Sequence, residues 1–337
     1  MKKHKLTFNI KKHSLPLLSL LLVSALMAGC GNSKEASSET GFYFNTMVSV
    51  TFYGDDKQYL DGAMEICAKY NQMLDRHTEG TLVSDLNKDK SATGCEELID
   101  IIKTAEEYSV DGKFDITVAP ILDLWGFSGD DPAVPDADEL SKLLSKERGY
   151  TYDEDAGTVT LTPDTELDFG GIAKGYAADR ISDYCSENGI ENALISLSNS
   201  SIVLVGTKPD GSDFKIGLQT PFAASGTYEY TLTAHDCSIS TSGSFERYFE
   251  EDGKIYHQLI DPDTGCPASS GLNSVTVITD GAAKADVIST ELFIMGYDAA
   301  MEYVESHDGI EAIFMDTDNK IYVSDGLTID GTAISFK

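Results

Sequence analysis

The chain has 337 residues and a formal net charge of −31, with 56 acidic against 25 basic side chains. So acidic a surface excludes general binding to nucleic acid and broad electrostatic contact with anionic lipid, because both carry negative charge themselves. The length is large for a single hydrophobic core, so one unit and two lobes are both open at this point.

The first 29 residues are typical of a bacterial lipoprotein signal peptide. Basic residues between Lys2 and Lys12 precede an apolar run at 15–27 that is too short for a comfortable membrane span. Small residues stand directly before Cys30. We therefore expect cleavage before Cys30, acylation of that residue and a lipid-anchored protein on the extracytoplasmic face of the cell membrane. The alternative is an ordinary signal peptide followed by an accidental cysteine.

Residues 30–40 are small and polar and lack core-forming side chains, which predicts a flexible tether to a folded domain at 41–337. Beyond Cys30 five cysteines remain, an odd number with no CxxC pair. This pattern indicates neither a zinc site nor a disulfide framework, and it favours free, mostly buried thiols. A single disulfide is the alternative.

From residue 41 onward the spacing of apolar residues predicts an α+β fold of mixed sheets with flanking helices. The first half predicts a strand at 42–53, helices at 61–74 and 95–110, a loop at 128–137, a helix at 138–146 and a hairpin at 150–161. The second half predicts a helix at 173–188, strands at 193–206, 214–218, 228–233 and 273–279, helices at 283–295 and 299–306, and two short closing strands.

The segment 167–180, LDFGGIAKGYAADR, predicts a strand that turns on Gly170 and Gly171 into a helix whose first turn carries Lys174. Glycines allow the backbone to approach a phosphate group, and both the helix N-terminus and the lysine charge favour an anion. Taken alone, the same pattern also fits a plain tight turn with Lys174 at the surface.

Asp286 and Thr290 lie four residues apart on the helix predicted at 283–295, so both project from one face. A carboxylate and a hydroxyl are hard oxygen ligands, suited to Mg²⁺ rather than zinc. The alternative is a solvated aspartate and a threonine bonded to its own helix backbone. Taking Asp286 as a helix-surface residue, we expect its removal to leave the fold largely intact.

His257 precedes a DPDTG turn and is a candidate acid or base at the edge of a cleft. A histidine held by a structural hydrogen bond is an equal alternative. The STSG segment at 240–243 offers hydroxyl groups, but no GxSxG motif supports a serine hydrolase.

Four segments, in this order, resemble the ApbE-type FAD:protein FMN transferases. They are KFDITVAPILDLWGF at 113–127, LDFGGIAKGYAADR at 167–180, STSGSFERYF at 240–249 with YHQLIDPDTG at 256–265, and AKADVISTELFIMG at 283–296. The resemblance covers nearly all of residues 42–337. Members of this family bind FAD and Mg²⁺ and move the FMN portion to a threonine or serine hydroxyl of a target protein, with release of AMP.

The resemblance implies a central FAD cleft, with Asp286 and Thr290 as Mg²⁺ ligands and a backbone carbonyl from Gly171. It also implies FAD contacts at Met47, His77, Lys113, Phe114, Asp115, Asp168, Lys174 and Ile260. Asp286 and His257 are the residues expected in catalysis. The chain departs from the family at Gln258, where a histidine usually stands, so the general base stays open between His257 and no side chain at all.

The activity that the resemblance implies is an Mg²⁺-dependent FMN transferase, held at the membrane by lipid, with a flavoprotein subunit as acceptor. Two alternatives remain: an Mg²⁺-dependent FAD pyrophosphatase that uses water in place of the hydroxyl, and a non-catalytic flavin-binding lipoprotein. The intact pair of Asp286 and Thr290 argues against binding alone.

Overall fold

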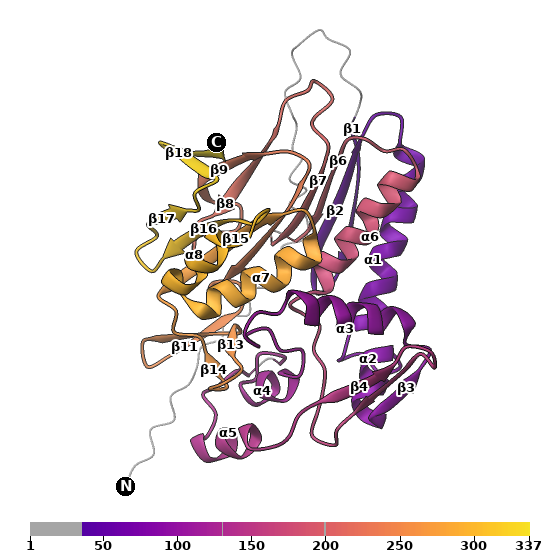
Figure 1. Cartoon of the computed structure of the whole chain (residues 1–337), viewed down its shortest axis with the longest axis vertical. Coiled ribbons are helices and arrows are strands. Elements are labelled where there is room, and N and C mark those ends of the chain that lie inside the picture. Colours follow the sequence, from indigo (N-terminus) through magenta and orange to yellow (C-terminus); the bar gives the residue numbers. More distant parts are fainter. Residues whose placement is uncertain (1–35, 130, 199) are drawn as a thin grey trace, which may run out of the picture. The chain divides into compact units, whose positions relative to one another are not determined.

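The computed structural model describes residues 36–129, 131–198 and 200–337, and this part of the chain belongs to one compact α+β unit. Its framework is an eight-stranded sheet of order β1-β2-β6-β7-β10-β15-β16-β17 (Figure 1). Every neighbouring pair in that sheet is antiparallel. The α+β prediction is confirmed, with one unit rather than two lobes. The predicted signal peptide and Cys30 lie outside the described residues.

The strands of the large sheet are Ala36–Tyr43 (β1), Thr46–Tyr53 (β2), Ala193–Leu197 (β6), Ser201–Val205 (β7), Cys237–Gly243 (β10), Leu272–Thr279 (β15), Glu311–Asp316 (β16) and Ile321–Val323 (β17). A four-stranded sheet contains Phe214–Gln219 (β8), Tyr228–Ala234 (β9), Leu327–Asp330 (β18) and Ala333–Phe336 (β19). Smaller pairings join Ser91–Thr93 (β3), Tyr150–Asp153 (β4) and Thr158–Leu161 (β5), then Tyr248–Glu251 (β11) with Lys254–His257 (β12), and Ile260–Asp261 (β13) with Cys266–Pro267 (β14).

The helices, after a 3₁₀ turn at Lys57–Tyr59, are Leu60–Leu74 (α1), Leu82–Asp89 (α2), Glu96–Tyr108 (α3), Ala119–Leu124 (α4), Ala137–Leu144 (α5), Ala173–Glu187 (α6), Ala282–Met295 (α7) and Tyr297–Glu305 (α8). The predicted helices at 61–74, 95–110, 138–146, 173–188, 283–295 and 299–306 are confirmed to within two residues at each end. The short helices α2 and α4 were not predicted.

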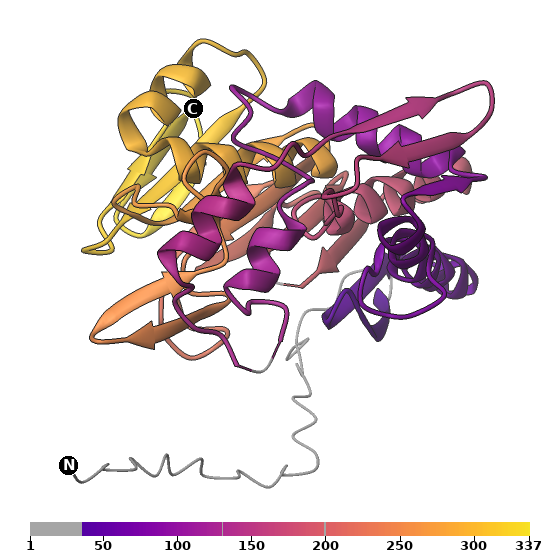
Figure 2. The ribbon, with the colours of Figure 1, turned by 90° about the horizontal axis from the view of Figure 1, so that it is seen from below.

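Helices cover one face of the large sheet, and the four-stranded sheet covers the other. α1 packs beside α6 along β2 and β6, and α7 crosses β10 and β15; the same arrangement is seen from below in Figure 2. On the opposite face, Leu204 and Ile239 of the large sheet pack against Phe214 and Leu232 of the smaller one. Because β15 lies between two packed layers, all of its residues are buried.

Two predicted strands are wrong, because each is a hairpin. The chain reverses at Phe44 and Asn45, whose φ angles of 52° and 57° form the left-handed two-residue turn that antiparallel strands favour. A second reversal, at Ser198, separates β6 from β7. The predicted tether is also wrong in its second half: β1 starts at Ala36 and pairs with β2 up to Tyr53, so residues 36–40 belong to the folded unit.

The chain ends in four short strands, β16 to β19, rather than the predicted two. The five cysteines of the described residues are all free, and Cys67, Cys95 and Cys185 are buried, which confirms the prediction of free thiols. Among the described helices, none combines the length and the apolar character that crossing a bilayer requires.

Candidate functional site

A cavity of about 620 Å³ opens between α6, α7 and β10 on one side and the loops at 75–77, 113–118 and 258–262 on the other. Ten of the residues predicted from the sequence line it: His77, Lys113, Phe114, Asp115, Asp168, Gly171, Lys174, Ile260, Asp286 and Thr290. Residues from sequence positions more than 200 apart thus meet in one concave site. The prediction of a cleft at these residues is therefore supported by their positions.

Asp286 lies on α7 and is buried, with only 4% of its surface exposed, so it is not the solvated aspartate of the alternative interpretation. Its Oδ1 accepts hydrogen bonds from the Ser201 hydroxyl at 2.6 Å and from the Ser240 hydroxyl. Its Oδ2 accepts one from the Gly175 N–H of α6 at 2.7 Å. These three donors fix the carboxylate in one orientation at the cavity wall.

Thr290 follows one helical turn later, and its hydroxyl donates to the Asp286 carbonyl at 3.2 Å. This is the bond to its own helix backbone that the alternative interpretation predicts. Its hydroxyl also lies 3.0 Å from the Ser242 hydroxyl of β10 and still lines the cavity. β10 thus presents Ser240 and Ser242, two residues apart and on one face, to Asp286 and Thr290 in turn.

The donor set at this wall fits Mg²⁺ better than a softer metal. It offers one carboxylate and several hydroxyl and carbonyl oxygens, and within the described residues no group of three or more His, Cys, Asp or Glu side chains is arranged to hold a metal. Mg²⁺ commonly takes only one or two carboxylates and completes its shell with substrate phosphate oxygens and water. The residues that would hold it are Asp286 and Thr290, and Gly171, whose carbonyl the family resemblance adds as a ligand, lines the same cavity.

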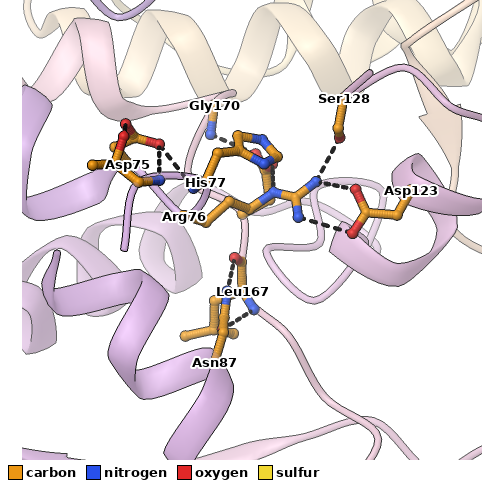
Figure 3. Close-up of polar contacts among 10 residues, drawn as sticks. Asp75, Arg76, His77, Asn87, Asp123, Ser128, Leu167 and Gly170 are labelled. Atoms are coloured by element: carbon orange, nitrogen blue, oxygen red, sulfur yellow. Dashed lines mark hydrogen bonds and ion pairs between the residues drawn. The ribbon is translucent and has the colours of Figure 1, made fainter. Parts of the chain in front are cut away.

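The segment before the double glycine belongs to no sheet, so the strand predicted there is wrong. Instead the Asn87 side chain pairs with the backbone of Leu167: its amide donates to the Leu167 carbonyl at 2.9 Å, and its oxygen accepts the Leu167 N–H at 2.7 Å (Figure 3). An amide side chain therefore replaces the neighbouring strand. The turn itself and the helix that follows Gly171 are as predicted.

Arg76 was missed by the sequence prediction, although its guanidinium organises one side of the cavity. Its Nη atoms donate to both oxygens of Asp123 at 3.0 and 2.7 Å, and its Nε donates to Asp168 at 2.6 Å (Figure 3). Ser128 accepts a further bond at 2.7 Å. The arginine side chain is only 6% exposed. The other oxygen of Asp168 accepts the Gly170 N–H at 2.7 Å, so Arg76 indirectly holds the glycine turn.

The cations of the cavity differ in how far they are neutralised. Lys113 is bound to Asp261 at 3.1 Å and to Asp263 at 2.6 Å, which ties the 113–115 segment to the DPDTG turn and raises the pKa of its ammonium group. Lys174 contacts the Gly170 carbonyl at 3.5 Å, and no carboxylate in the described residues lies within ion-pair distance of it. Lys174 therefore keeps its charge available for an anion in the cavity.

A buried glutamate braces the loop that carries Phe114. Glu291, on α7 next to Thr290, accepts the Val110 N–H at 2.6 Å, the Phe114 N–H at 2.9 Å and the Ser109 hydroxyl at 3.0 Å. Burial raises the pKa of Glu291 to about 7. The Phe114 ring in turn covers Gly171, where an added Cβ would come within 2.7 Å of it. Glu291 lies directly before the apolar run Leu292-Phe293 of α7, and a charged residue beside such a run is the sequence signal that could have found it.

Two predicted residues are not brought to the cavity. Met47 lies in β2 beside the lining residue Thr46, but its side chain is 60% exposed and does not line the cavity. His257, at the end of β12, is buried against the edge of the Phe293 ring, and its Nε2 lies 3.1 Å from the Ala268 carbonyl. Because alternate residues of an extended segment face opposite sides, the next residue, Gln258, lines the cavity instead. A catalytic base at His257 therefore has no geometric basis.

The burial of His257 predicts how the stability of the protein depends on pH. Desolvation lowers its pKa from 6.5 to about 4, so the folded protein holds it neutral while the unfolded chain takes up a proton below pH 6.5. Stability is therefore lost as the pH falls from 6.5 toward 4, by on the order of 3 kcal/mol from this group. Urea unfolding at several pH values should show a smaller loss for His257→Gln than for the wild type. Parallel curves for the two proteins would contradict the assignment.

Comparison with protein families identifies one match. The model of the ApbE family matches residues 44–314, which is most of the chain and includes all of the residues that line the cavity except Met315. Among curated proteins, an FAD:protein FMN transferase of Klebsiella pneumoniae is 32% identical over 287 residues, covering 82% of this chain and 88% of its own length. An FAD:protein FMN transferase of Treponema pallidum is 30% identical over 232 residues, covering 64% of each chain.

Solved structures with the same fold include two bacterial proteins. The ApbE protein of Thermotoga maritima superposes with a TM-score of 0.77 at 27% identity, covering 86% of this chain and 97% of its own. The flavin transferase ApbE of Vibrio cholerae superposes with a TM-score of 0.75 at 25% identity, again over 86% of this chain and 97% of its own.

Proposed function

This chain belongs to the ApbE family, and on that premise we propose that it is an FAD:protein FMN transferase. The reaction breaks the pyrophosphate bond of FAD, releases AMP and leaves FMN attached through its phosphate to a threonine or serine hydroxyl of an acceptor flavoprotein. The observation that carries the proposal is the cavity, where the folded chain brings Asp286, Thr290, Lys174 and the Gly170–Gly171 turn to one wall.

The residues of that wall suit phosphoryl transfer, in which a protein must neutralise oxygen charge and hold the nucleophile in line. Mg²⁺, when bound by Asp286 and Thr290, would act as a Lewis acid toward the pyrophosphate. Lys174 adds a positive charge that forms no ion pair in the described residues, and the carboxylate that interacts with it electrostatically, Glu246, lines the same cavity. The glycine turn lets the backbone approach the phosphates, and Arg76 holds Asp168 in the position that supports this turn.

The test is to incubate the purified full chain with FAD, Mg²⁺ and a candidate acceptor flavoprotein. A transferase raises the acceptor mass by one FMN and releases an equal amount of AMP. Free FMN and AMP with an unchanged acceptor would indicate a pyrophosphatase instead. FAD binding without any product would indicate a flavin-binding protein and would contradict the proposal.

We further propose that the protein is anchored by lipid on Cys30, because a basic segment, a short apolar run and small residues precede that cysteine. Cys30→Ala is expected to abolish acylation and to release the protein from the membrane fraction, whereas Ser33→Ala should not. Mass spectrometry of the mature N-terminus from the native host tests this. A wild-type N-terminus without added lipid mass would contradict it.

A further inference from the structure

FMN transfer needs an acceptor for the proton of the attacking hydroxyl, because a serine or threonine hydroxyl is a weak nucleophile at its own pKa. His257 does not reach the cavity, and its neighbour Gln258 has no basic atom with which to take a proton. Among the described residues the remaining candidates are the other acidic and imidazole side chains that line the cavity: Asp75, His77, Asp115, Asp168, Glu246 and Asp286.

All four aspartates are already committed as hydrogen-bond acceptors. Asp75 accepts from His77 N–H and from the Thr78 hydroxyl. The Thr117 N–H and hydroxyl both donate to Asp115 at 2.7 Å. Asp168 and Asp286 hold the partners described above, so the oxygens of these carboxylates are already occupied by donors of the fold. This leaves Glu246 and His77.

Glu246 lies in the turn that joins β10 to β11, four residues beyond the serine that contacts Thr290. The next residue in this turn, Arg247, accepts a backbone hydrogen bond from Gln258 N–H at 3.1 Å. The turn is therefore hydrogen-bonded to the segment that directly follows His257. Glu246 and residues 258–260 line the same cavity.

The electrostatic surroundings separate Glu246 from His77. Glu246 interacts electrostatically with Lys174 of α6, with Asp286 of α7 and with its neighbour Arg247, and all three line the same cavity as Glu246. His77 interacts instead with Asp75 and Asp123, at the end of α1. No hydrogen-bond donor in the described residues contacts the Glu246 carboxylate. Glu246 is exposed to solvent where it lines the cavity. Desolvation by the surrounding protein, more than any neighbouring charge, raises the pKa of its carboxyl group.

We propose that Glu246 is the general base of the transfer step, an inference that rests on the proposed function. The proton of the acceptor hydroxyl moves to the Glu246 carboxylate as the hydroxyl oxygen forms a bond to the phosphorus of the FMN portion. The bond from that phosphorus to the bridging oxygen breaks, and its electron pair leaves with AMP. Glu246 then returns its proton to solvent, so the group is regenerated for the next turnover.

The test compares Glu246→Gln, Glu246→Asp and the control Glu250→Gln in the full chain. Glu250 lies in β11, is exposed and does not line the cavity. We expect Glu246→Gln to lower kcat for FMN transfer by about 10²–10⁴-fold, because general base catalysis typically contributes that much. FAD affinity, measured by flavin fluorescence with Mg²⁺ present, should stay within threefold of wild type. Glu246→Asp should recover part of kcat, and Glu250→Gln should match the wild type.

The pH profile gives a second readout. The base must be deprotonated, so kcat/KM of the wild type should fall as the pH decreases through the raised pKa of Glu246, and Glu246→Gln should lack this acid limb. The assignment is overturned if Glu246→Gln transfers FMN within threefold of the wild-type kcat, or if it loses only FAD affinity. If the wild type itself forms no flavinylated acceptor, the proposed function fails, and this inference with it. A normal wild type beside an equally active Glu246→Gln removes the inference alone.

Discussion

Replacing Asp286 by alanine is expected to abolish measurable FMN transfer. The substitution removes the carboxylate that lines the cavity one helical turn before Thr290, and with it the negative charge that would retain Mg²⁺. The measurement is AMP release at saturating FAD and Mg²⁺. Asp298→Asn, on the exposed first turn of α8, is the matched control and should keep full activity. Undiminished turnover in Asp286→Ala would contradict the assignment of the site.

The same substitution is also expected to destabilise the protein, contrary to the prediction from sequence that it spares the fold. Asp286 is buried, and its loss leaves the Gly175 N–H without an acceptor, while Ser201 and Ser240 must find other partners. Unpaired buried donors cost about 1–3 kcal/mol each, so a loss of about 2–4 kcal/mol in the free energy of unfolding is expected. Asp286→Asn should lose activity but less stability, because it keeps an oxygen acceptor.

Replacing Gly175 by alanine is expected to have the largest effect on the fold. An added Cβ would lie 2.3 Å from the carbonyl oxygen of Ala282 and 2.7 Å from the nitrogen of Ala283, so α6 and α7 would have to separate. The gain in helix propensity, about 1 kcal/mol, does not offset a clash with backbone atoms that cannot rotate away. We expect a loss of about 3 kcal/mol or more in the free energy of unfolding, together with weaker FAD binding.

Gly281→Ala is the control for that experiment. Its Cβ would meet Lys284 at an ordinary 3.6 Å, so the variant should unfold close to the wild type. Urea unfolding and flavin fluorescence measure the two effects. A Gly175→Ala protein that unfolds within 1 kcal/mol of wild type would mean that the two helices can separate at little cost.

The parts of the fold that could be predicted from sequence are those whose pattern is local. Apolar spacing placed α1, α3 and α6 because one face of each packs against the core, and α7 because most of its residues are buried. The hairpins at 42–53 and 193–206 were not predicted, because each turns on a residue that rarely adopts positive φ: Phe44 in the first, Ser198 in the second.

The residues of the candidate site also fall into those that a local pattern reveals and those that only the tertiary structure reveals. The spacing of Asp286 and Thr290 is visible on one helix, and their shared face is confirmed. Arg76 could not be found, because its partners Asp123 and Asp168 lie 47 and 92 residues away in sequence. The orientation of His257 was equally hidden: a shift of one residue in a four-residue strand decides whether it or Gln258 faces the cavity. Tertiary pairing, not local pattern, settles such positions.

The free cysteines of the folded unit have a chemical consequence. Burial raises the pKa of both Cys67 and Cys185 to about 12, so only a minute fraction of either is thiolate at neutral pH. Since the thiolate is the form that attacks disulfides and oxidants, the native protein keeps these sulfurs unreactive without needing a reducing compartment. The unfolded chain has no such protection, and its thiols react as ordinary cysteines. Incorrect disulfides are therefore a hazard of the interval before folding, which is when a reductant would raise the yield of native protein.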